Sequence, residues 1–205
     1  MTMIGEQMFE AGTEEQIQLV DGNWIFLDIG FSGTKKTCGL VIGDAEARCV
    51  DFAEAKNRII GHLAAAKSRT NLVVEAPLSV SFRNGLPAPR SVDKRDGKNR
   101  FWYVGLGCGV MVASMYLIKA VKEARPPNGV RLFEAFVSFK EPGVKSDHKR
   151  EVELLREIVR DPKSHRHRIV PAEELKERED DELMSAFGVN GIDCGVPAVI
   201  ILLPG

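Results

Sequence analysis

The chain contains 205 residues, of which 44% are hydrophobic and 28% charged, so it is long enough for one well-packed domain. Its formal net charge of −1 excludes a uniformly basic protein, so any binding of nucleic acid has to rest on local charge. The four cysteines show neither C-x-x-C spacing nor histidine partners at zinc-finger distances, which argues against disulfides and structural zinc.

Residues 1–20 hold four glutamates and no basic residue, which predicts a flexible acidic arm that could contact a protein partner. The first basic residue is Lys35, so the start lacks the positive segment of a secretory signal, and we expect a cytoplasmic protein. Residues 21–205 are expected to form a single domain.

The stretch from Trp24 to Gly43, WIFLDIGFSGTKKTCGLVIG, predicts a β-hairpin, because two runs of strand-forming residues flank a turn that contains glycine. The first run is apolar on both faces, as in the centre of an α/β sheet, and it ends at Asp28. A carboxylate in that position requires hydrogen bonds, a cation or a metal ion. Ser32 and Lys35, in the turn, are candidate phosphate contacts.

Two elements are predicted directly after the hairpin. Residues 48–50 predict a third strand, and Asp51 stands three residues before Glu54, at the capping-box spacing that marks a helix start. Apolar residues then recur at helical intervals up to residue 63. Residues 71–75, NLVVE, predict a short apolar strand that again ends in a carboxylate, Glu75.

Segment 79–100 is rich in turn formers and charge, and we expect a long loop. Between Arg83 and Arg100 it contains six Lys and Arg residues against two Asp residues. Two interpretations stay open: these bases contact a phosphate backbone, or they solvate a mobile loop.

Residues 101–118 contain no charged side chain, and this length is the lower limit for a membrane span. Three glycines and a serine dilute the run, so we expect no membrane contact. The run predicts a helix buried in the core that extends to about Ala124 and stops at Pro126 and Pro127.

The last part of the chain predicts a strand at 130–139 with Glu134 inside it, and a helix capped by Ser146 or Asp147. His165 and His167 are expected in a polar connection without a metal ion.

An acidic helix is then expected to begin at Pro171 and to end at the glycines 188 and 191. It carries Asp180 and Asp181, one of which is expected to point inward. Residues 198–203 predict a closing apolar strand or tail.

The acids at the strand ends suggest a common site, because neighbouring strands of a sheet lie about 5 Å apart. Carboxylates that close repel each other unless divalent cations neutralise them, and oxygen ligands favour Mg²⁺ or Mn²⁺. Two such ions about 4 Å apart clamp the oxygens of a phosphodiester and activate water. The candidate metal ligands are Asp28, Glu75 and Asp181, and the candidate catalytic group adds Glu134 and Asp180. Taken singly, each Asp is also consistent with a cap or a salt-bridge partner.

The order of these acids resembles the RNase H-like superfamily, and within it the predicted nucleases of domain of unknown function 429, over roughly residues 25–187. The segments LDIG, VVEAPLS, FEAF and DDELMSA match the family motifs, and the resemblance gives metal-binding or catalytic roles to the acids within them: Asp28, Glu75, Glu134 and one of Asp180 and Asp181. RSVDKR matches a substrate-facing Arg and Asp pair, and its candidate substrate contacts are Arg90, Asp93, Lys94 and Arg95.

The resemblance implies an α/β fold with a mixed sheet, in which antiparallel hairpin strands come first and parallel strands follow, flanked by helices. It also implies metal-dependent hydrolysis of phosphodiester bonds in DNA or RNA, with Mg²⁺ or Mn²⁺ as cofactor.

Two other functions stay open. The segment DIGFSGTKK resembles the first phosphate-binding element of sugar kinases and actin-like ATPases, which would make the chain a phosphotransferase or ATPase. Alternatively, the chain is a non-catalytic subunit of a larger complex that keeps the ligands for folding or regulation. Stabilisation by Mn²⁺ would distinguish a functional metal site from this last possibility.

Overall fold

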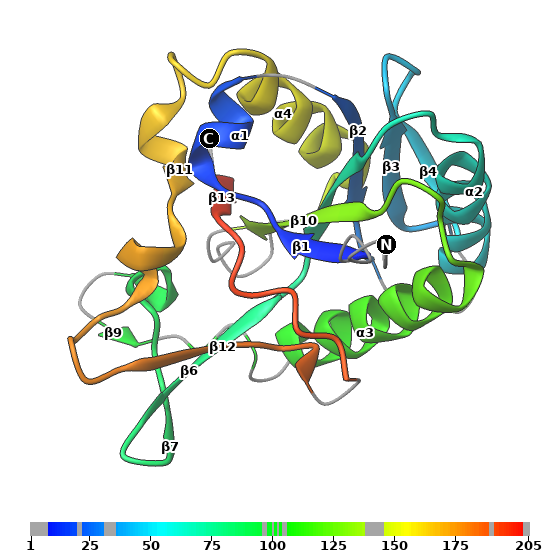
Figure 1. Ribbon diagram of the computed structural model, residues 1–205. Helices are drawn as coiled ribbons and strands as arrows, with labels where there is room; N and C mark the ends of the chain where they lie inside the picture. The colour runs from blue at the N-terminus through cyan, green and yellow to red at the C-terminus, as the bar shows by residue number, and fades with distance from the viewer. Residues whose placement is uncertain are drawn as a thin grey trace.

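A mixed β-sheet lies at the centre of the molecule, with helices on both of its faces (Figure 1). The computed structural model describes residues 8–19, 22–30, 36–95, 98–99, 101, 103, 106–137, 146–188 and 191–202. The strands of the main sheet are β1 (Phe9–Ala11), β2 (Asn23–Asp28), β3 (Cys38–Ile42), β4 (Arg48–Val50), β5 (Thr70–Glu75), β10 (Val130–Val137), β11 (Ile169–Val170) and β13 (Val199–Leu202). The α-helices are α1 (Glu14–Gln18), α2 (Phe52–Ala65), α3 (Leu106–Ala124) and α4 (His148–Arg160).

The strands follow the order β11-β13-β10-β5-β2-β3-β4. The first hairpin and β4 pair antiparallel, whereas β5, β10 and β13 run parallel to β2. β1 lies parallel to the first half of β10, on the edge that β13 continues. The predicted α/β class, with a mixed sheet flanked by helices, is therefore confirmed, although the parallel strand β1 precedes the hairpin.

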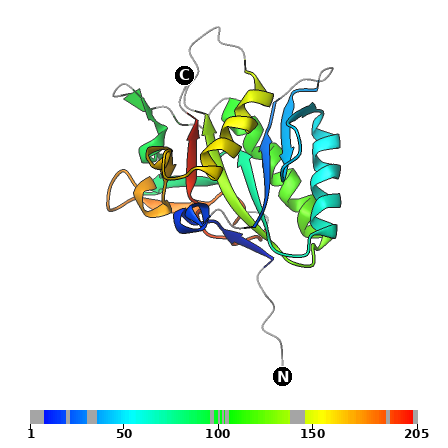
Figure 2. The same cartoon turned by 90° about the horizontal axis from the view of Figure 1, so that it is seen from above.

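Both faces of the central strands are buried, and this explains why those strands are apolar throughout. In β2, Ile25 and Leu27 point to the face that α2 and α3 cover. Trp24 and Phe26 point to the opposite face, where α4 packs. Figure 2 shows the sheet between these helices from a second direction. Each core contains side chains from the strands and from the helices. This packing fixes the positions of the helices on the faces of the sheet.

Two predicted helix starts are confirmed. The Asp51 side chain accepts a hydrogen bond from the Glu54 amide at the start of α2, and Asp147 accepts one from the Arg150 amide at the start of α4. The apolar stripe of α4 is fully buried, as its periodicity predicts.

Residues 106–118 of the uncharged run lie in α3, but this helix buries only one face. Leu117 and Val121 contact the core, whereas Val112 and Tyr116 are 57% and 58% exposed. The expectation of a helix buried in the core is therefore correct for one face of α3 only. Among the described residues, no helix combines the length and the hydropathy needed to cross a membrane.

The described part of segment 1–20 is built into the fold and does not form the predicted free arm. β1 adds to the sheet, and Glu10 forms ion pairs with Arg69 and Arg131. Ile17 of α1 is completely buried. Propensity and charge pointed to a mobile arm, but strand pairing and one buried side chain outweigh them.

Segment 79–100, expected as a loop, contains regular structure instead. The elements are β6 (Ser79–Arg83), β7 (Leu86–Ala88), the 3₁₀ turn η1 (Ser91–Asp93), β8 (Lys94–Arg95) and β9 (Lys98–Asn99). β6 and β7 form a hairpin around Asn84-Gly85, a dipeptide typical of tight β-turns.

The acidic helix expected from Pro171 is also absent. The chain makes the 3₁₀ turns η2 (Arg166–Arg168) and η3 (Ala172–Leu175) and then β12 (Glu182–Ser185). β12 pairs antiparallel with β6, so a smaller three-stranded sheet forms to one side of the main sheet (Figure 2). Pairing with a strand about 100 residues earlier overrides the local helix preference.

Candidate metal centre

Two of the predicted metal ligands lie side by side at the ends of neighbouring strands. Asp28 ends β2, Glu75 ends β5, and the two residues are paired in register. The Asp28 side chain is fully buried, and Glu75 is partly buried. The prediction that these strand-end acids converge is confirmed.

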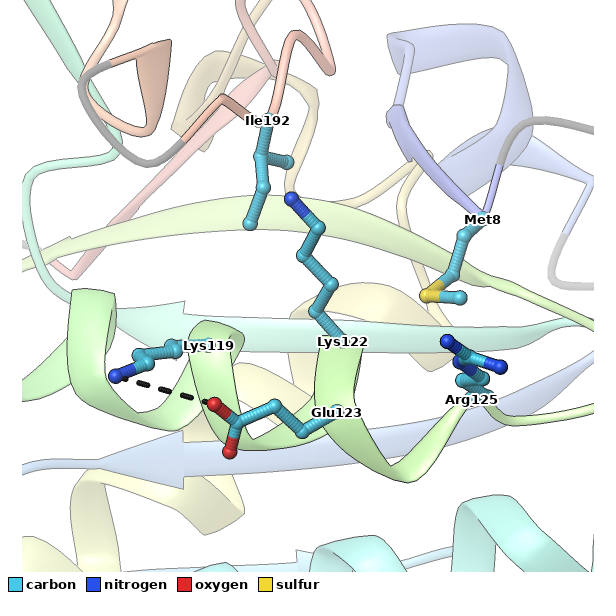
Figure 3. Close-up of a pocket in the computed structure, with 6 residues that line it drawn as sticks. All are labelled: Met8, Lys119, Lys122, Glu123, Arg125 and Ile192. Carbon is cyan, nitrogen blue, oxygen red and sulfur yellow. Dashed lines mark ion pairs between the residues drawn. The ribbon is translucent and has the colours of Figure 1, made fainter.

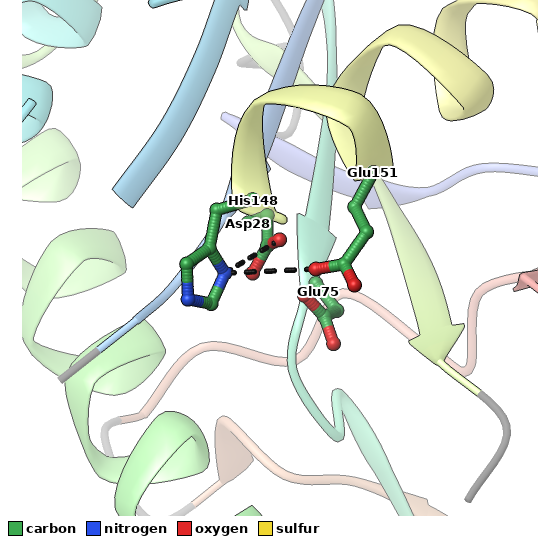
Figure 4. A group of neighbouring side chains, drawn as sticks. All are labelled: Asp28, Glu75, His148 and Glu151. Atoms are coloured by element: carbon green, nitrogen blue, oxygen red, sulfur yellow. Dashed lines mark hydrogen bonds and ion pairs between the residues drawn. The ribbon is translucent and has the colours of Figure 1, made fainter. Parts of the chain in front are cut away.

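The first turn of α4 adds two further ligands, His148 and Glu151 (Figure 4). His148 Nδ1 lies 2.8 Å from Asp28 Oδ2 and 3.6 Å from Glu151 Oε2. Each of the four residues, including Glu75, offers one ligand atom, and these atoms all lie within 4.8 Å of one another. The group therefore joins β2, β5 and α4 at one point.

Two glycines allow α4 to approach the strands this closely. Gly39 lies opposite Asp28 in the hairpin, and a Cβ atom there would overlap the carbonyl oxygen of His148. A Cβ atom on Gly30 would lie 2.6 Å from His148 Nε2 and would also overlap Thr37. The backbone space at these two positions is what sets His148 against Asp28.

The helix geometry places both α4 ligands on the same side. His148 and Glu151 are three residues apart, so they are neighbours on one face of the helix. They stand in the first turn, where the unpaired amide groups carry partial positive charge that favours nearby carboxylates. The Asp147 cap fixes where this turn begins.

The charge balance of the group favours a bound cation. Burial raises the pKa of Asp28, but hydrogen bonding to Glu75, His148 and Glu151 outweighs this effect, and the pKa is lowered. Asp28 Oδ1 is buried and has no hydrogen-bond partner among the described residues. Burying an acceptor without a hydrogen-bond partner costs free energy. A cation bound at this oxygen would offset that cost.

The donor set fits a divalent metal ion. Three carboxylates suit Mg²⁺ and Mn²⁺, and an imidazole nitrogen suits transition metals better than it suits Mg²⁺. Together these side chains could hold a divalent metal ion.

Glu134, a predicted member of the catalytic group, lies outside this cluster in a buried ion-pair network. Arg90 Nη1 donates to Glu134 Oε1 at 2.8 Å and to Oε2 at 2.9 Å, and Leu78 and Ser79 donate backbone N–H groups to Oε2. Burial raises the pKa of Glu134, and the Arg90 charge and these hydrogen bonds oppose that effect. These contacts hold Glu134 in the ion-pair network and apart from the Asp28 cluster.

Arg90 and Asp93, expected to face substrate, complete the same network. Both side chains are fully buried, and Arg90 Nε donates to Asp93 Oδ2 at 3.0 Å. Burial lowers the pKa of Arg90, but the charges and hydrogen bonds of Glu134 and Asp93 together have a larger, opposite effect. The pKa is therefore raised, and the guanidinium stays charged. A buried pair of this kind cannot contact a substrate, so the expectation is wrong for both residues.

Asp181 is buried as predicted. However, it pairs with an arginine and not with a metal site, and it lies in a turn and not in a helix. Arg83 Nε donates to Asp181 Oδ1 at 2.7 Å, and the Glu177 and Arg178 amides donate to Oδ2. Asp180 is exposed. Since the expected helix is absent, neither residue joins the cluster that holds Asp28.

The basic side chains that the structure describes in segment 83–100 form ion pairs with acidic residues. Arg83 pairs with Asp181 and Glu177, and Lys94 pairs with Glu177. The positive excess predicted from composition is therefore largely neutralised within the part of the segment that the structure describes. Ser32, Lys35 and the side chain of Arg95 lie outside the described residues.

Two members of the cluster, His148 and Glu151, did not appear among the candidates from sequence. Asp147 identified the helix start correctly, but the histidine and glutamate that follow read as ordinary first-turn residues. The available signal was the i, i+3 pair of metal-ligand side chains at the start of a helix that follows an apolar strand.

The comparisons with known proteins add no relative. No protein-family model, no curated protein and no solved structure matches the chain. The site must therefore be interpreted from its own geometry.

Proposed function

We propose that the chain is a metal-dependent nuclease that hydrolyses phosphodiester bonds of nucleic acid, with one divalent ion held by Asp28, Glu75, His148 and Glu151. The observation that carries the proposal is the convergence of these four ligand side chains at the ends of two parallel strands. The mixed sheet of antiparallel and parallel strands also agrees with the resemblance to RNase H-like nucleases.

The four side chains would divide the work according to their burial. Asp28 is the innermost ligand, anchored by β2 and completely buried. Glu75, His148 and Glu151 are only partly buried, so they would hold the ion on the side that solvent and substrate can reach. A bound divalent ion supplies Lewis-acid activation of a phosphoryl oxygen and of water.

The hydrogen bond between His148 and Asp28 orients the imidazole. His148 Nδ1 and Asp28 Oδ2 share a hydrogen bond of 2.8 Å. The other ring nitrogen, Nε2, lies close to Gly30. A ligand oriented in this way costs little reorganisation when an ion binds.

The phosphotransferase and non-catalytic hypotheses stay open. The phosphate-binding turn required by the first falls largely on residues 31–35, which lie outside the described residues. The non-catalytic hypothesis is consistent with the same geometry and differs from the proposal only in predicting no enzymatic activity.

The proposal is tested by adding Mn²⁺ to the full chain and to a D28N/E75Q double variant. We expect Mn²⁺ to raise the melting temperature of the wild type, because it relieves carboxylate repulsion, and to support cleavage of labelled single-stranded DNA or RNA. At one hundred times its dissociation constant, one ion stabilises by about 2.7 kcal/mol. The double variant should lose both effects.

An exposed acid provides the control. D180N also removes a negative charge, but outside the cluster, and this variant should keep both effects. Mn²⁺ stabilisation without cleavage of any nucleic acid would favour the non-catalytic subunit. Equal stabilisation of the wild type and the double variant would refute the metal site itself.

A further inference from the structure

Arg125 adopts a backbone conformation that L-residues with side chains rarely occupy. Its φ angle is +50°, and the only other described non-glycine residue with positive φ is Asn84, in a tight hairpin turn. Asparagine tolerates this region, but arginine does not gain from it. The position follows the end of α3, where glycine is the usual choice.

The Arg125 side chain lines a cavity of about 790 Å³ that is open to solvent beside the end of α3, where the charged lining residues are exposed (Figure 3). The other lining residues are Met8, Lys119, Lys122, Glu123 and Ile192. This volume lies within the range of small-molecule sites. The strained backbone thus brings a guanidinium to the wall of a ligand-sized cavity.

The cavity is positively charged on balance. It is lined by three cations and one carboxylate, and that carboxylate, Glu123, approaches Lys119 only at 3.8 Å. Lys122 Nζ donates to the Gly191 carbonyl oxygen at 3.4 Å, which holds its charge toward Ile192 (Figure 3). An anion is the complementary ligand.

Helix capping alone does not explain this arrangement. Cations in the last turn of a helix do interact favourably with its C-terminal carbonyl groups. However, the Lys122 ammonium in the last turn is directed to the Gly191 carbonyl oxygen, and glycine at position 125 would end the helix without strain. Strain that persists in a conformation of this kind is typical of functional positions.

The apolar part of the wall indicates more than a simple anion. The Met8 thioether lies beside Arg125 in Figure 3, and Ile192 lies across the cavity. A flexible thioether and a branched aliphatic side chain form a suitable surface for a flat ring. An arginine fork matches the oxygens of a phosphate group.

We propose that this cavity is a second binding site, for a small phosphorylated ligand with a planar ring, of the mononucleotide class. Met8 precedes β1 and Arg125 precedes β10, so both lie where these parallel strands begin. Asp28 and Glu75 lie where the parallel strands end. The site is therefore separate from the candidate metal centre and independent of its function.

Calorimetry with AMP as the probe tests the site, with inorganic phosphate, adenosine and a short oligonucleotide without terminal phosphate as separate arms. We expect AMP to bind more tightly than phosphate or adenosine alone. R125G should weaken AMP binding about tenfold or more, because a charge-assisted phosphate contact is lost. The same substitution should raise the melting temperature, because glycine relieves the positive φ.

Two matched variants complete the design. N84G also places glycine at a positive φ, in the remote β6–β7 turn, and should leave AMP binding unchanged. K119Q should weaken AMP binding without raising the melting temperature. D28N/E75Q should bind AMP like the wild type, so that failure of the metal proposal and failure of this one remain distinguishable.

Three results would overturn the proposal. The first is no detectable AMP binding to the wild type at millimolar concentration. The second is an R125G affinity within twofold of the wild-type value. The third is displacement of AMP by the oligonucleotide with equal affinity, which would assign the cations to nucleic-acid backbone.

Discussion

Single glycines control the candidate metal centre as much as its charged ligands do. Gly39 has no side chain at the point where the first turn of α4 meets the hairpin, and Gly30 leaves room for the His148 ring. The carboxylates supply the chemistry, but these two positions determine whether the ligands from α4 reach them.

We therefore expect Gly39→Ala to lose Mn²⁺-dependent stabilisation and to destabilise the fold by about 1–3 kcal/mol, since the new methyl group overlaps the His148 backbone. Gly61→Ala, inside α2, is the matched control. A Cβ atom at Gly61 meets nothing within 4 Å, so alanine should stabilise the helix by about 0.5–1 kcal/mol and leave metal binding intact. Urea unfolding with and without Mn²⁺ measures both effects. A Gly39 variant that still gains stability from Mn²⁺ would contradict the role given to this glycine.

At the level of secondary-structure elements, the short segments near the ends of the chain prove to be integral parts of the fold. α1 contributes one buried side chain, Ile17, to the core under α4. β12 contributes an edge to the smaller sheet, and the turn before it is fastened by Asp181.

Ile17→Ala should cost about 2–5 kcal/mol of unfolding free energy, because it leaves a cavity in a fully buried position. Leu19→Ala, two residues later and 73% exposed, should change stability by less than about 0.5 kcal/mol. Chemical denaturation of both variants gives the comparison. Equal, small effects would restore the view of this segment as a mobile arm.

The turn before β12 should make stability depend on pH. Hydrogen bonding to Arg83 lowers the pKa of Asp181 against the effect of burial. Because the folded pKa lies below the unfolded value of about 3.9, the ionised carboxylate stabilises the fold above that value. This stability is lost as the pH falls through the folded pKa.

We therefore expect Asp181→Asn to be less stable than the wild type at pH 7 and to lose less stability between pH 5 and pH 3. Denaturant unfolding at several pH values measures the two slopes. Asp180→Asn is the neighbouring exposed control and should follow the wild-type curve. Parallel curves for Asp181→Asn and wild type would show that the ion pair contributes nothing to the pH dependence.

Across the whole molecule, one buried network connects the two sheets. Arg90 joins Asp93 in η1 and Ser79 in β6 to Glu134 in the main sheet. All four side chains are fully buried, so the smaller sheet is attached to the larger one through charged groups that water does not reach.

Arg90→Met should destabilise the protein by about 3–5 kcal/mol, because it leaves the Glu134 and Asp93 carboxyls buried without a counter-charge. The remaining folded fraction should still gain stability from Mn²⁺, since the network lies apart from the Asp28 cluster. Thermal unfolding with and without the metal separates the two properties. Loss of the Mn²⁺ effect in this variant would return Glu134 to the metal site.

Local pattern was sufficient for the elements whose partners lie nearby in the chain. The hairpin through Asp28, the capped starts of α2 and α4, and the strand ending at Glu75 all follow from alternation, periodicity and capping. Two strand-end acids on adjacent parallel strands necessarily approach each other, so half of the cluster was predictable as well.

The rest depended on contacts between distant segments. Glu134 and Asp181 were predicted as ligands. In the folded chain each forms an ion pair with an arginine from a distant segment: Arg90 with Glu134, and Arg83 with Asp181. His148 and Glu151 looked like ordinary helix residues, and the packing of α4 on Gly39 brings them to Asp28. A carboxylate carries the same charge whether a base or a metal ion neutralises it, and only the folded chain decides which of the two lies within reach.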